Sequence, residues 1–132
     1  MSSVELVHAT GLTDTTPYAC AAVVGPGSLV LTAGACPLDE AGDVVCAGDL
    51  VGQARRVMDN LVRALEATGC ALTDVARTTV YVASADRADL VTVWREVRAA
   101  FGDHDVPSTL LGVAVLGYPD QLVEVEAIAV RP

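Results

Sequence analysis

Two stretches of this sequence repeat apolar residues at the spacing of an α-helix, and this repeat limits the folds open to the chain more than any other feature. Asp49 can cap the first helix and Gly69 can end it. Its apolar positions are Leu50, Val51, Ala54, Val57, Met58, Leu61, Val62 and Leu65. Ser84 or Asp86 can begin the second helix, and Gly102 can end it. Its apolar face is Leu90, Val93, Trp94, Val97 and Phe101. Both helices therefore need a hydrophobic surface to cover.

The segments around the helices have the composition and alternation of β-strands. The expected strands are residues 19–25, 28–35, 74–83, 108–116 and 122–131. The Pro-Gly pair at 26–27 predicts that the first two form a hairpin. A short strand can also form at Val44–Val45, and another near the N-terminus. The order β-β-α-β-α-β-β, without repeats or linkers, predicts one α+β domain over residues 1–132, in which a mixed sheet carries both helices on one face.

The two faces of the predicted sheet differ in chemistry. One face carries small and branched apolar side chains that suit the helices: Val80, Val82, Val123, Val125, Ala127 and Ala129. The opposite face mixes charged, polar and aliphatic side chains: Arg77, Thr79, Tyr81, Glu124, Glu126, Ile128 and Val130. Because two helices cannot cover both faces, we expect the second face to meet a partner subunit, with a wet site at its edge.

The charge balance argues against nucleic acids and anionic membranes as partners. The formal net charge is −9, and the eight Lys and Arg residues are scattered along the 132-residue chain. Nucleic-acid binding needs a basic face that displaces counterions from phosphates. The first residues, MSSVELVHAT, lack the basic start and apolar run of a signal peptide, and no stretch reaches the ~18 apolar residues of a membrane span. A cytoplasmic location is therefore expected.

The cysteines and histidines do not have the spacing of a metal site. The four cysteines are Cys20, Cys36, Cys46 and Cys70, and no two of them form a Cys-x-x-Cys pair. His8 and His104 lie far apart in the sequence. We therefore expect free thiols and no structural metal. A chain of this length can bury enough surface to fold without disulfides or a bound metal.

Several motifs, in the same order, resemble those of the Rid (YjgF) family. The stretch TPYACAAVVGPGSLVLTAGACPLD resembles that family's P-Y-S-Q-A and S-G-Q-x-P-L-D segments, and VEVEAIAV resembles its closing E-x-E-A-x-A-V strand. The resemblance covers about residues 14–131. It implies a chorismate-mutase-like fold and a homotrimer with sites in the clefts between subunits. It also implies hydrolysis of reactive imines and enamines without a cofactor.

The resemblance further implies where a site would lie. Tyr18 and Gly34 match the family's motifs, and Glu124 matches the last-strand glutamate that helps to activate water. Cys20 stands where the family has glutamine. Ala33 and Ala35 replace the serine and the glutamine on the two sides of the glycine in the S-G-Q segment. Glu124 is therefore the expected catalytic residue. The expected substrate-binding residues are Tyr18, Cys20, Gly34, Ala35, Cys36, Ser108 and Thr109.

The main departure from the family is a missing arginine. In the family an arginine on the penultimate strand holds the substrate carboxylate, and Ser108 takes its place here, within one residue either way. No Lys or Arg occurs between Arg98 and Arg131. A serine cannot reproduce a bidentate arginine–carboxylate pair. We therefore expect little hydrolysis of simple 2-imino acids.

Each candidate residue also has a structural alternative. Glu124 is either a general base for water or half of a cross-strand or intersubunit ion pair, for which Arg77 is a candidate partner, and Glu126 is assigned to such a structural pair. Arg77 itself either pairs with a strand glutamate or offers a substitute anion site. Cys20 and Cys36 are either nucleophiles toward C=N or C=O carbons or small buried hydrophobes.

The remaining candidates are open in the same way. Tyr18 lines the cleft or packs within a loop. Ser108 and Thr109 bind a ligand or simply begin a strand. Trp94 is expected to pack in the core.

Two classes of function follow from these patterns. The first is an enzyme that hydrolyses, or transfers water or a proton to, an imine or enamine without a simple α-carboxylate. The second is a ligand-binding or partner protein of the same fold. The name ribonuclease is also attached to this family. Ribonuclease activity is disfavoured here by the net charge of −9 and the lack of a basic patch.

Overall fold

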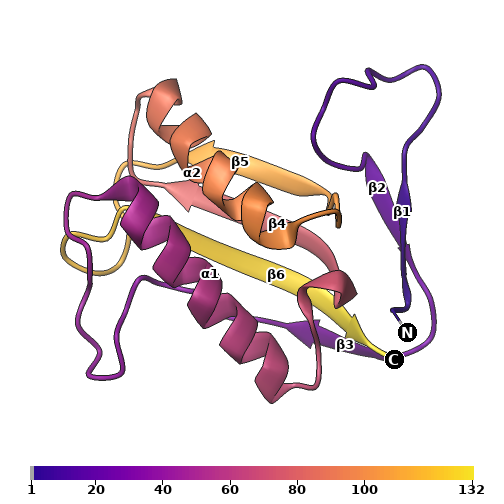
Figure 1. Ribbon diagram of the computed structural model, residues 1–132, viewed down its shortest axis with the longest axis horizontal. Helices are drawn as coiled ribbons and strands as arrows, with labels where there is room; N and C mark the ends of the chain where they lie inside the picture. Colours follow the sequence, from indigo (N-terminus) through magenta and orange to yellow (C-terminus); the bar gives the residue numbers. More distant parts are fainter. Residues whose placement is uncertain (1) are drawn as a thin grey trace.

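The computed structural model describes residues 2–132, which form a four-stranded sheet covered by two helices, beside a separate two-stranded sheet (Figure 1). The strands are β1 (Val4–Val7), β2 (Ala21–Val24), β3 (Ser28–Leu31), β4 (Val75–Val82), β5 (Ser108–Gly112) and β6 (Val123–Arg131). The helices are α1 (Leu50–Ala67) and α2 (Arg87–Phe101), with a short 3₁₀ turn, η1 (Leu72–Asp74), between α1 and β4. The α+β class and the expected element order, with the N-terminal strand included, are confirmed.

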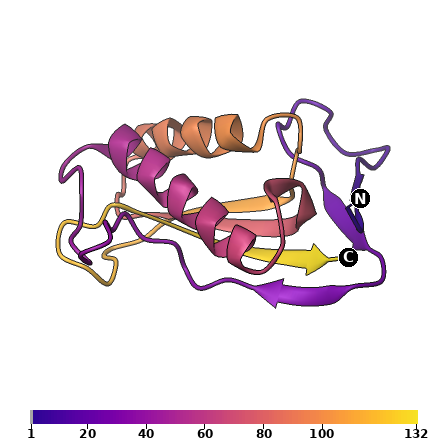
Figure 2. The ribbon, with the colours of Figure 1, turned by 60° about the horizontal axis from the view of Figure 1, so that its bottom comes forward.

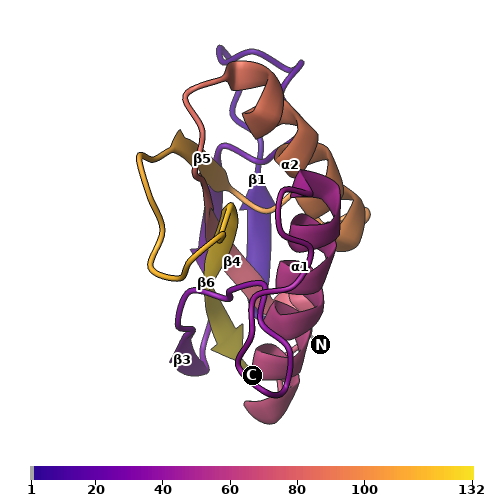
Figure 3. The ribbon, with the colours of Figure 1, turned by 90° about the vertical axis from the view of Figure 1, so that its left-hand side faces the viewer.

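The larger sheet has the strand order β3-β6-β4-β5 and is mixed, as expected. β4 and β5 are parallel, because α2 carries the chain back between them, whereas β6 runs antiparallel to both β3 and β4. Both helices form a single layer on one side of this sheet (Figure 2). The other face of the sheet carries no helix (Figure 3).

The predicted helix boundaries arise from the expected capping residues. The Asp49 side chain accepts a hydrogen bond from the backbone N–H of Gly52, and the Asp86 side chain accepts one from Ala88. Gly69 follows the C-cap of α1 with a φ of +83°, a conformation that glycine adopts without strain. Asp86 rather than Ser84 is therefore the residue that begins the second helix.

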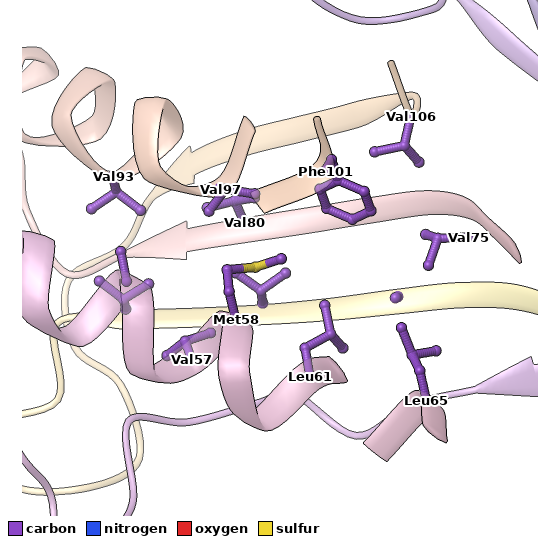
Figure 4. Close-up of a cluster of buried hydrophobic side chains, with 14 of the residues drawn as sticks. Val57, Met58, Leu61, Leu65, Val75, Val80, Val93, Val97, Phe101 and Val106 are labelled. Atoms are coloured by element: carbon purple, nitrogen blue, oxygen red, sulfur yellow. The ribbon is translucent and has the colours of Figure 1, made fainter. Parts of the chain in front are cut away.

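The hydrophobic core lies between the helices and the sheet (Figure 4). Val57, Leu61 and Leu65 of α1 and Val93 of α2 are fully buried. They pack against the apolar rows expected on β4 and β6, including Val80 and Val125. Valine, leucine and alanine supply most of this core, and Phe101 is its one aromatic member within residues 2–132. The predicted division of the sheet into a helix face and an open face is confirmed by this packing.

The predicted hairpin between residues 19–25 and 28–35 is wrong. β2 pairs with β1 instead, with Val4 opposite Val24, and β3 pairs with β6, with Leu29 opposite Val130. The Gly-Pro-Gly connection at 25–27 bends but does not reverse the chain, so it leads from the small sheet into the large one. The free edge of β6 then pairs with β3.

Four other expectations need correction. The strand expected at 28–35 ends at Leu31, and the one at 108–116 ends at Gly112, so the chain is irregular around Gly34 and after β5. Val130, expected on the open face, is buried, and Gly27 lies close to its side chain. The short strand at Val44–Val45 is reduced to one bridge, between Leu38 and Val44.

Among residues 2–132, neither helix is long and apolar enough to cross a membrane.

Candidate functional site

Glu124 lies on β6, on the open face of the sheet, and one of its two carboxylate oxygens is fixed by the protein. Its Oε1 accepts hydrogen bonds from the Cys36 thiol (Sγ to Oε1, 3.2 Å) and from the Gln121 side-chain amide (Nε2 to Oε1, 3.1 Å). Within residues 2–132, no donor occupies Oε2. The half-buried carboxylate is therefore held in one orientation, and its second oxygen accepts no hydrogen bond within residues 2–132.

Gly34 makes room for this carboxylate. A Cβ atom at residue 34 would collide with Oε2 and with the carboxylate carbon of Glu124. The chain still follows β6 on either side of the glycine, through a hydrogen bond from Thr32 N–H to the Ala127 carbonyl and a bridge between Ala35 and Val125. Gly34 thus allows backbone and carboxylate to approach closely, which a larger residue would prevent.

Helix α1 holds both segments that flank Glu124. The Asn60 amide donates to the carbonyls of Cys36 and Leu38, each at 2.9 Å. The fully buried Gln53 donates to the Asp120 carbonyl at 2.8 Å and accepts from the Leu122 N–H at 2.7 Å. The positions of Cys36 and of the turn before β6 are therefore set by polar side chains of the helix.

The surroundings of Cys36 keep its thiol protonated. Burial, the hydrogen bond to Glu124 and the negative charge of Glu124 together raise the pKa of Cys36 from 9.0 to about 11. A thiolate is the reactive form of cysteine, so this environment opposes nucleophilic catalysis by Cys36. The geometry gives Cys36 a different role, as a donor that orients Glu124.

Tyr18, Ser108 and Thr109 line a hollow of about 420 Å³ at the start of β5, away from Glu124. Trp94 of α2 lines the same pocket and meets Tyr18 edge to face, with the ring centroids 6.1 Å apart. Ser108 is turned toward the core, since its hydroxyl lies 2.6 Å from that of buried Thr78. Trp94 is therefore only partly a core residue, and its ring helps to form a pocket wall.

Cys20 lies apart from both groups. It is exposed, its thiol donates to the Val7 carbonyl at 3.1 Å, and it lines a pocket of about 220 Å³ within the N-terminal segment. Tyr18 lines this pocket too. The eight candidate residues thus fall into three places, with Gly34, Ala35 and Cys36 beside Glu124.

The ion pair suggested between Arg77 and a strand glutamate is absent from residues 2–132, where the only ion pair joins Arg55 and Glu96. Arg77 donates instead to the Thr109 hydroxyl (Nη2 to Oγ1, 2.9 Å). Glu126 accepts a hydrogen bond of 2.6 Å from the Tyr81 hydroxyl, and this bond raises the pKa of Tyr81 above its usual value.

Sequence reasoning missed Gln121, Gln53 and Asn60. All three are polar residues whose side chains are bonded to the backbone around the site. Gln121 is 4% exposed and also accepts from the Tyr118 N–H. The sequence did carry a signal for these residues, because Gln53 and Asn60 interrupt or border the apolar face of α1, where a polar group must find a hydrogen-bond partner.

No group of three or more His, Cys, Asp or Glu side chains within residues 2–132 has the geometry to hold a metal ion.

Comparisons with known proteins agree with this architecture. A 2-iminobutanoate/2-iminopropanoate deaminase of Salmonella typhimurium is 36% identical over 119 residues, covering 83% of this chain and 91% of that protein. The crystal structure of the Rid-family protein YyfB from Yersinia pestis superposes with a TM-score of 0.91 at 25% identity, covering 98% and 99% of the two chains. The structure of the Escherichia coli YjgF gene product has a TM-score of 0.68 at 33% identity, covering 96% and 94%.

The family model described as Endoribonuclease L-PSP matches residues 10–131, which is nearly the whole chain. The matched region includes the Glu124 cluster, the pocket beside Tyr18 and the complete four-stranded sheet. On this match, and on the identity to the curated relatives, the chain belongs to the Endoribonuclease L-PSP family, the family of the Rid and YjgF proteins.

Proposed function

We propose that this protein hydrolyses an imine- or enamine-type metabolite in a cleft between subunits, with Glu124 as the general base. The observation that carries the proposal is the arrangement of its carboxylate, in which Cys36 and Gln121 hold Oε1 while Oε2, which lies against Gly34, has no hydrogen-bond donor within residues 2–132. The relative from Salmonella typhimurium, a 2-iminobutanoate/2-iminopropanoate deaminase, supports the same class of reaction.

In the proposed reaction, Oε2 of Glu124 takes a proton from water as the water oxygen bonds to the C=N carbon. The electrons of the C=N π bond move to nitrogen, which takes up a proton. The amine nitrogen of the resulting carbinolamine then takes up the proton held by Glu124, the C–N bond breaks with release of ammonia, and the hydroxyl proton passes to solvent as the carbonyl compound forms. A positioned carboxylate contributes a factor of about 10²–10⁴ to such proton transfers.

The side chains available narrow the chemistry further. All eight basic residues of the 132-residue chain are arginines, so no lysine amine can form a Schiff base with a carbonyl substrate. The protonated thiol of Cys36 is a poor nucleophile. Activated water is the reagent that the Glu124 cluster can supply.

Simple 2-imino acids are poor candidates for the substrate. Their carboxylate is one bond from the imine carbon, so its cationic partner would have to lie close to Glu124. The guanidinium of Arg77 contacts Thr109, which lies on β5 with β4 between it and β6. Ser108 and Thr109 offer only hydroxyl groups at the start of β5.

The intersubunit cleft requires a second chain, which a homotrimer would supply, and the open face of the sheet supports such an association. Leu29 and Leu31 are 63% and 67% exposed on the edge strand β3, and Ile128 is 38% exposed beside them on β6. Burying these side chains against a second chain would remove apolar surface from water. Sedimentation at micromolar concentration should give three chains per particle, and a monomer would contradict the cleft.

The catalytic role is tested by changing Glu124 to Gln, which keeps the shape and removes the base. Imines are generated in the cuvette by an amine oxidase or an amino-acid oxidase, and their decay is followed by trapping with semicarbazide. We expect wild-type protein to accelerate the decay of a neutral imine. We expect 2-iminopropanoate to decay little faster than in buffer. The Glu124→Gln variant should hydrolyse the neutral imine more slowly than wild type by a factor of about 10²–10⁴.

The matched control is Glu66→Gln on the exposed side of α1, which should keep full activity. Melting and sedimentation of the same samples separate lost chemistry from lost structure. A folded Glu124→Gln trimer with full turnover would rule out the catalytic role. It would favour the second function, a ligand-binding protein of the same fold, for which the half-enclosed pocket of about 420 Å³ beside Tyr18 and Trp94 is the specific support.

A further inference from the structure

The side-chain amide of Gln121 is buried in the turn before β6 and already has three partners. Gln121 is 4% exposed. Its Nε2 donates to Oε1 of Glu124 and to the Val123 carbonyl, each at 3.1 Å. Its Oε1 accepts a hydrogen bond of 3.1 Å from the Tyr118 N–H. Both N–H groups of the amide are therefore engaged, so Gln121 contacts Glu124 but has no donor left for a substrate.

The partners of this amide allow it only one orientation. A backbone N–H can only donate, so the Tyr118 N–H must face the amide oxygen. The Val123 carbonyl can only accept, so it must face the amide nitrogen. Reversing the amide would bring two donors together at Tyr118 and two acceptors together at Val123. The group that Gln121 presents to Glu124 is therefore always an N–H donor.

Helix α1 holds the backbone on both sides of Gln121. The turn lies beside the N-terminal end of this helix (Figure 1). Gln53 of α1, which is fully buried, donates to the Asp120 carbonyl at 2.8 Å and accepts from the Leu122 N–H at 2.7 Å. Asp120 has a φ of +62°, a left-handed conformation that non-glycine residues seldom adopt unless their surroundings impose it. Two buried glutamines thus connect the core helix to the Glu124 carboxylate.

Glu124 needs such a donor because its carboxylate is otherwise free to turn. The last torsion of a glutamate side chain is broad, so the carboxylate alone has no strongly preferred direction. A catalytic group has to be held within about 0.5 Å and 10–20° of its productive geometry. Cys36, the other donor to Oε1, offers a thiol, which is a weak donor. A hydrogen bond from an amide to a charged carboxylate is stronger, so Gln121 is the main restraint on this rotation.

We propose that Gln121 is a positioning residue, which sets the direction of the Glu124 carboxylate toward the water that it activates. The proposal rests on the hydrolysis proposed above for Glu124. It gives the turn 118–121 a part in the reaction as well as in the fold. Because both donors of Gln121 are engaged within the protein, its effect should fall on the rate of the reaction and not on the binding of substrate.

A double-mutant cycle tests whether Gln121 acts through Glu124. Gln121→Met keeps the length of the side chain and removes the amide. In the wild-type background it should lower kcat on a neutral imine by about 10- to 100-fold and leave KM unchanged, since a small displacement of a catalytic group costs rate. In the Glu124→Gln background the same change should lower kcat by no more than about twofold, because the base that Gln121 positions is already gone.

A purely structural role of Gln121 gives a different pattern. The loss of the Tyr118 partner would then lower activity equally in both backgrounds, and only as far as the protein unfolds. Val97→Ala is the matched control, because it removes two buried methyl groups from α2 and destabilises the fold without touching the turn. It should keep full kcat below its melting temperature. Equal losses in the two backgrounds, or full kcat in folded Gln121→Met, would overturn the proposal.

A second measurement needs no turnover and no change at residue 121. Gln53 and Gln121 are the only glutamines in the 132-residue chain, so NMR shows two pairs of glutamine side-chain amide signals. Glu124→Ala removes the carboxylate and should shift the Gln121 pair. The Gln53 pair, which is bonded to the backbone, should stay in place. An unmoved Gln121 pair would contradict the contact on which the proposal stands.

These results separate the inference from the function on which it rests. Turnover that depends on Glu124, with equal losses from Gln121→Met in both backgrounds, would retain the hydrolase and remove the positioning role. Wild-type protein without turnover, but with a Gln121 signal that responds to Glu124→Ala, would remove the hydrolase. The contact between amide and carboxylate would then be part of the fold alone, which also overturns the positioning role.

Discussion

The Cys36 thiol should react slowly with electrophiles, and the structure sets the size of the effect. Its pKa of about 11, against 9.0 for an ordinary thiol, lowers the thiolate fraction near pH 7.5 by about 100-fold. The more basic thiolate is intrinsically more nucleophilic, by roughly 6- to 10-fold for a Brønsted slope of about 0.4–0.5. The net expectation is alkylation about 10-fold slower than that of an unperturbed thiol, before any steric protection is added.

The assay is alkylation by iodoacetamide as a function of pH, followed by mass spectrometry of the peptide that contains Cys36. The same peptide in urea-unfolded protein is the reference. Between pH 9 and pH 10.5 the rate in folded protein should still rise by about 20-fold, whereas the unfolded reference, already half ionised at pH 9.0, should rise by only about twofold.

Glu124→Gln removes two of the three causes that raise the Cys36 pKa, the hydrogen bond to a carboxylate and the nearby negative charge, and leaves burial, the largest. The rate at pH 7.5 should therefore increase in this variant, whereas Glu66→Gln should leave it unchanged. A folded-state profile that levels off at or below pH 9, with no response to Glu124→Gln, would refute the thiol–carboxylate contact.

Three other variants and one pH dependence follow from the same contacts. Gly34→Ala places a methyl group against the Glu124 carboxylate and should lower activity, with a stability loss of about 1–3 kcal/mol by urea titration. Gln121→Leu leaves the Tyr118 N–H without its partner and should cost about 1–3 kcal/mol in the same titration. Leu31→Asp puts a charge on the exposed edge of β3 and should give monomers in sedimentation if the wild type forms the proposed trimer. Because folding raises the Cys36 pKa, its contribution to stability is fully present below pH 9.0 and is lost as the pH rises through about 11, which unfolding at several pH values measures against Cys36→Ala.

The elements that local sequence determines were predictable. The two helices have caps and apolar faces that can be identified one residue at a time, as Asp49 and Leu61 show. The pairing of β2 and β3 was not predictable in this way, because it depends on which distant strand offers a free edge. The Pro-Gly signal at 26–27 indicates only that the chain changes direction there.

The candidate site was predictable in part for the same reason. The closing motif identifies Glu124 as a candidate, yet its hydrogen bonds to Cys36 and Gln121 join residues that lie 88 and 3 positions away. The expectation that Arg77 pairs with a glutamate assumed the correct faces of the strands, since Arg77 does share a sheet face with Glu126. It failed because the rotamer of a long side chain is chosen by tertiary contacts, here the Thr109 hydroxyl.

The separate β1–β2 sheet has a consequence for the dynamics of the site. Its hydrogen bonds to the rest of residues 2–132 are few: Ala19 N–H to the Asp105 carbonyl, Ser2 to the Thr73 carbonyl, and Arg98 to the Pro17 carbonyl. A unit tied down so lightly can open without unfolding the core, so its amide protons should exchange with deuterium well before those of β4 and β6. Tyr18 lies beside the second of its strands, so each opening would also withdraw one wall of the pocket at Trp94 and let a ligand enter or leave.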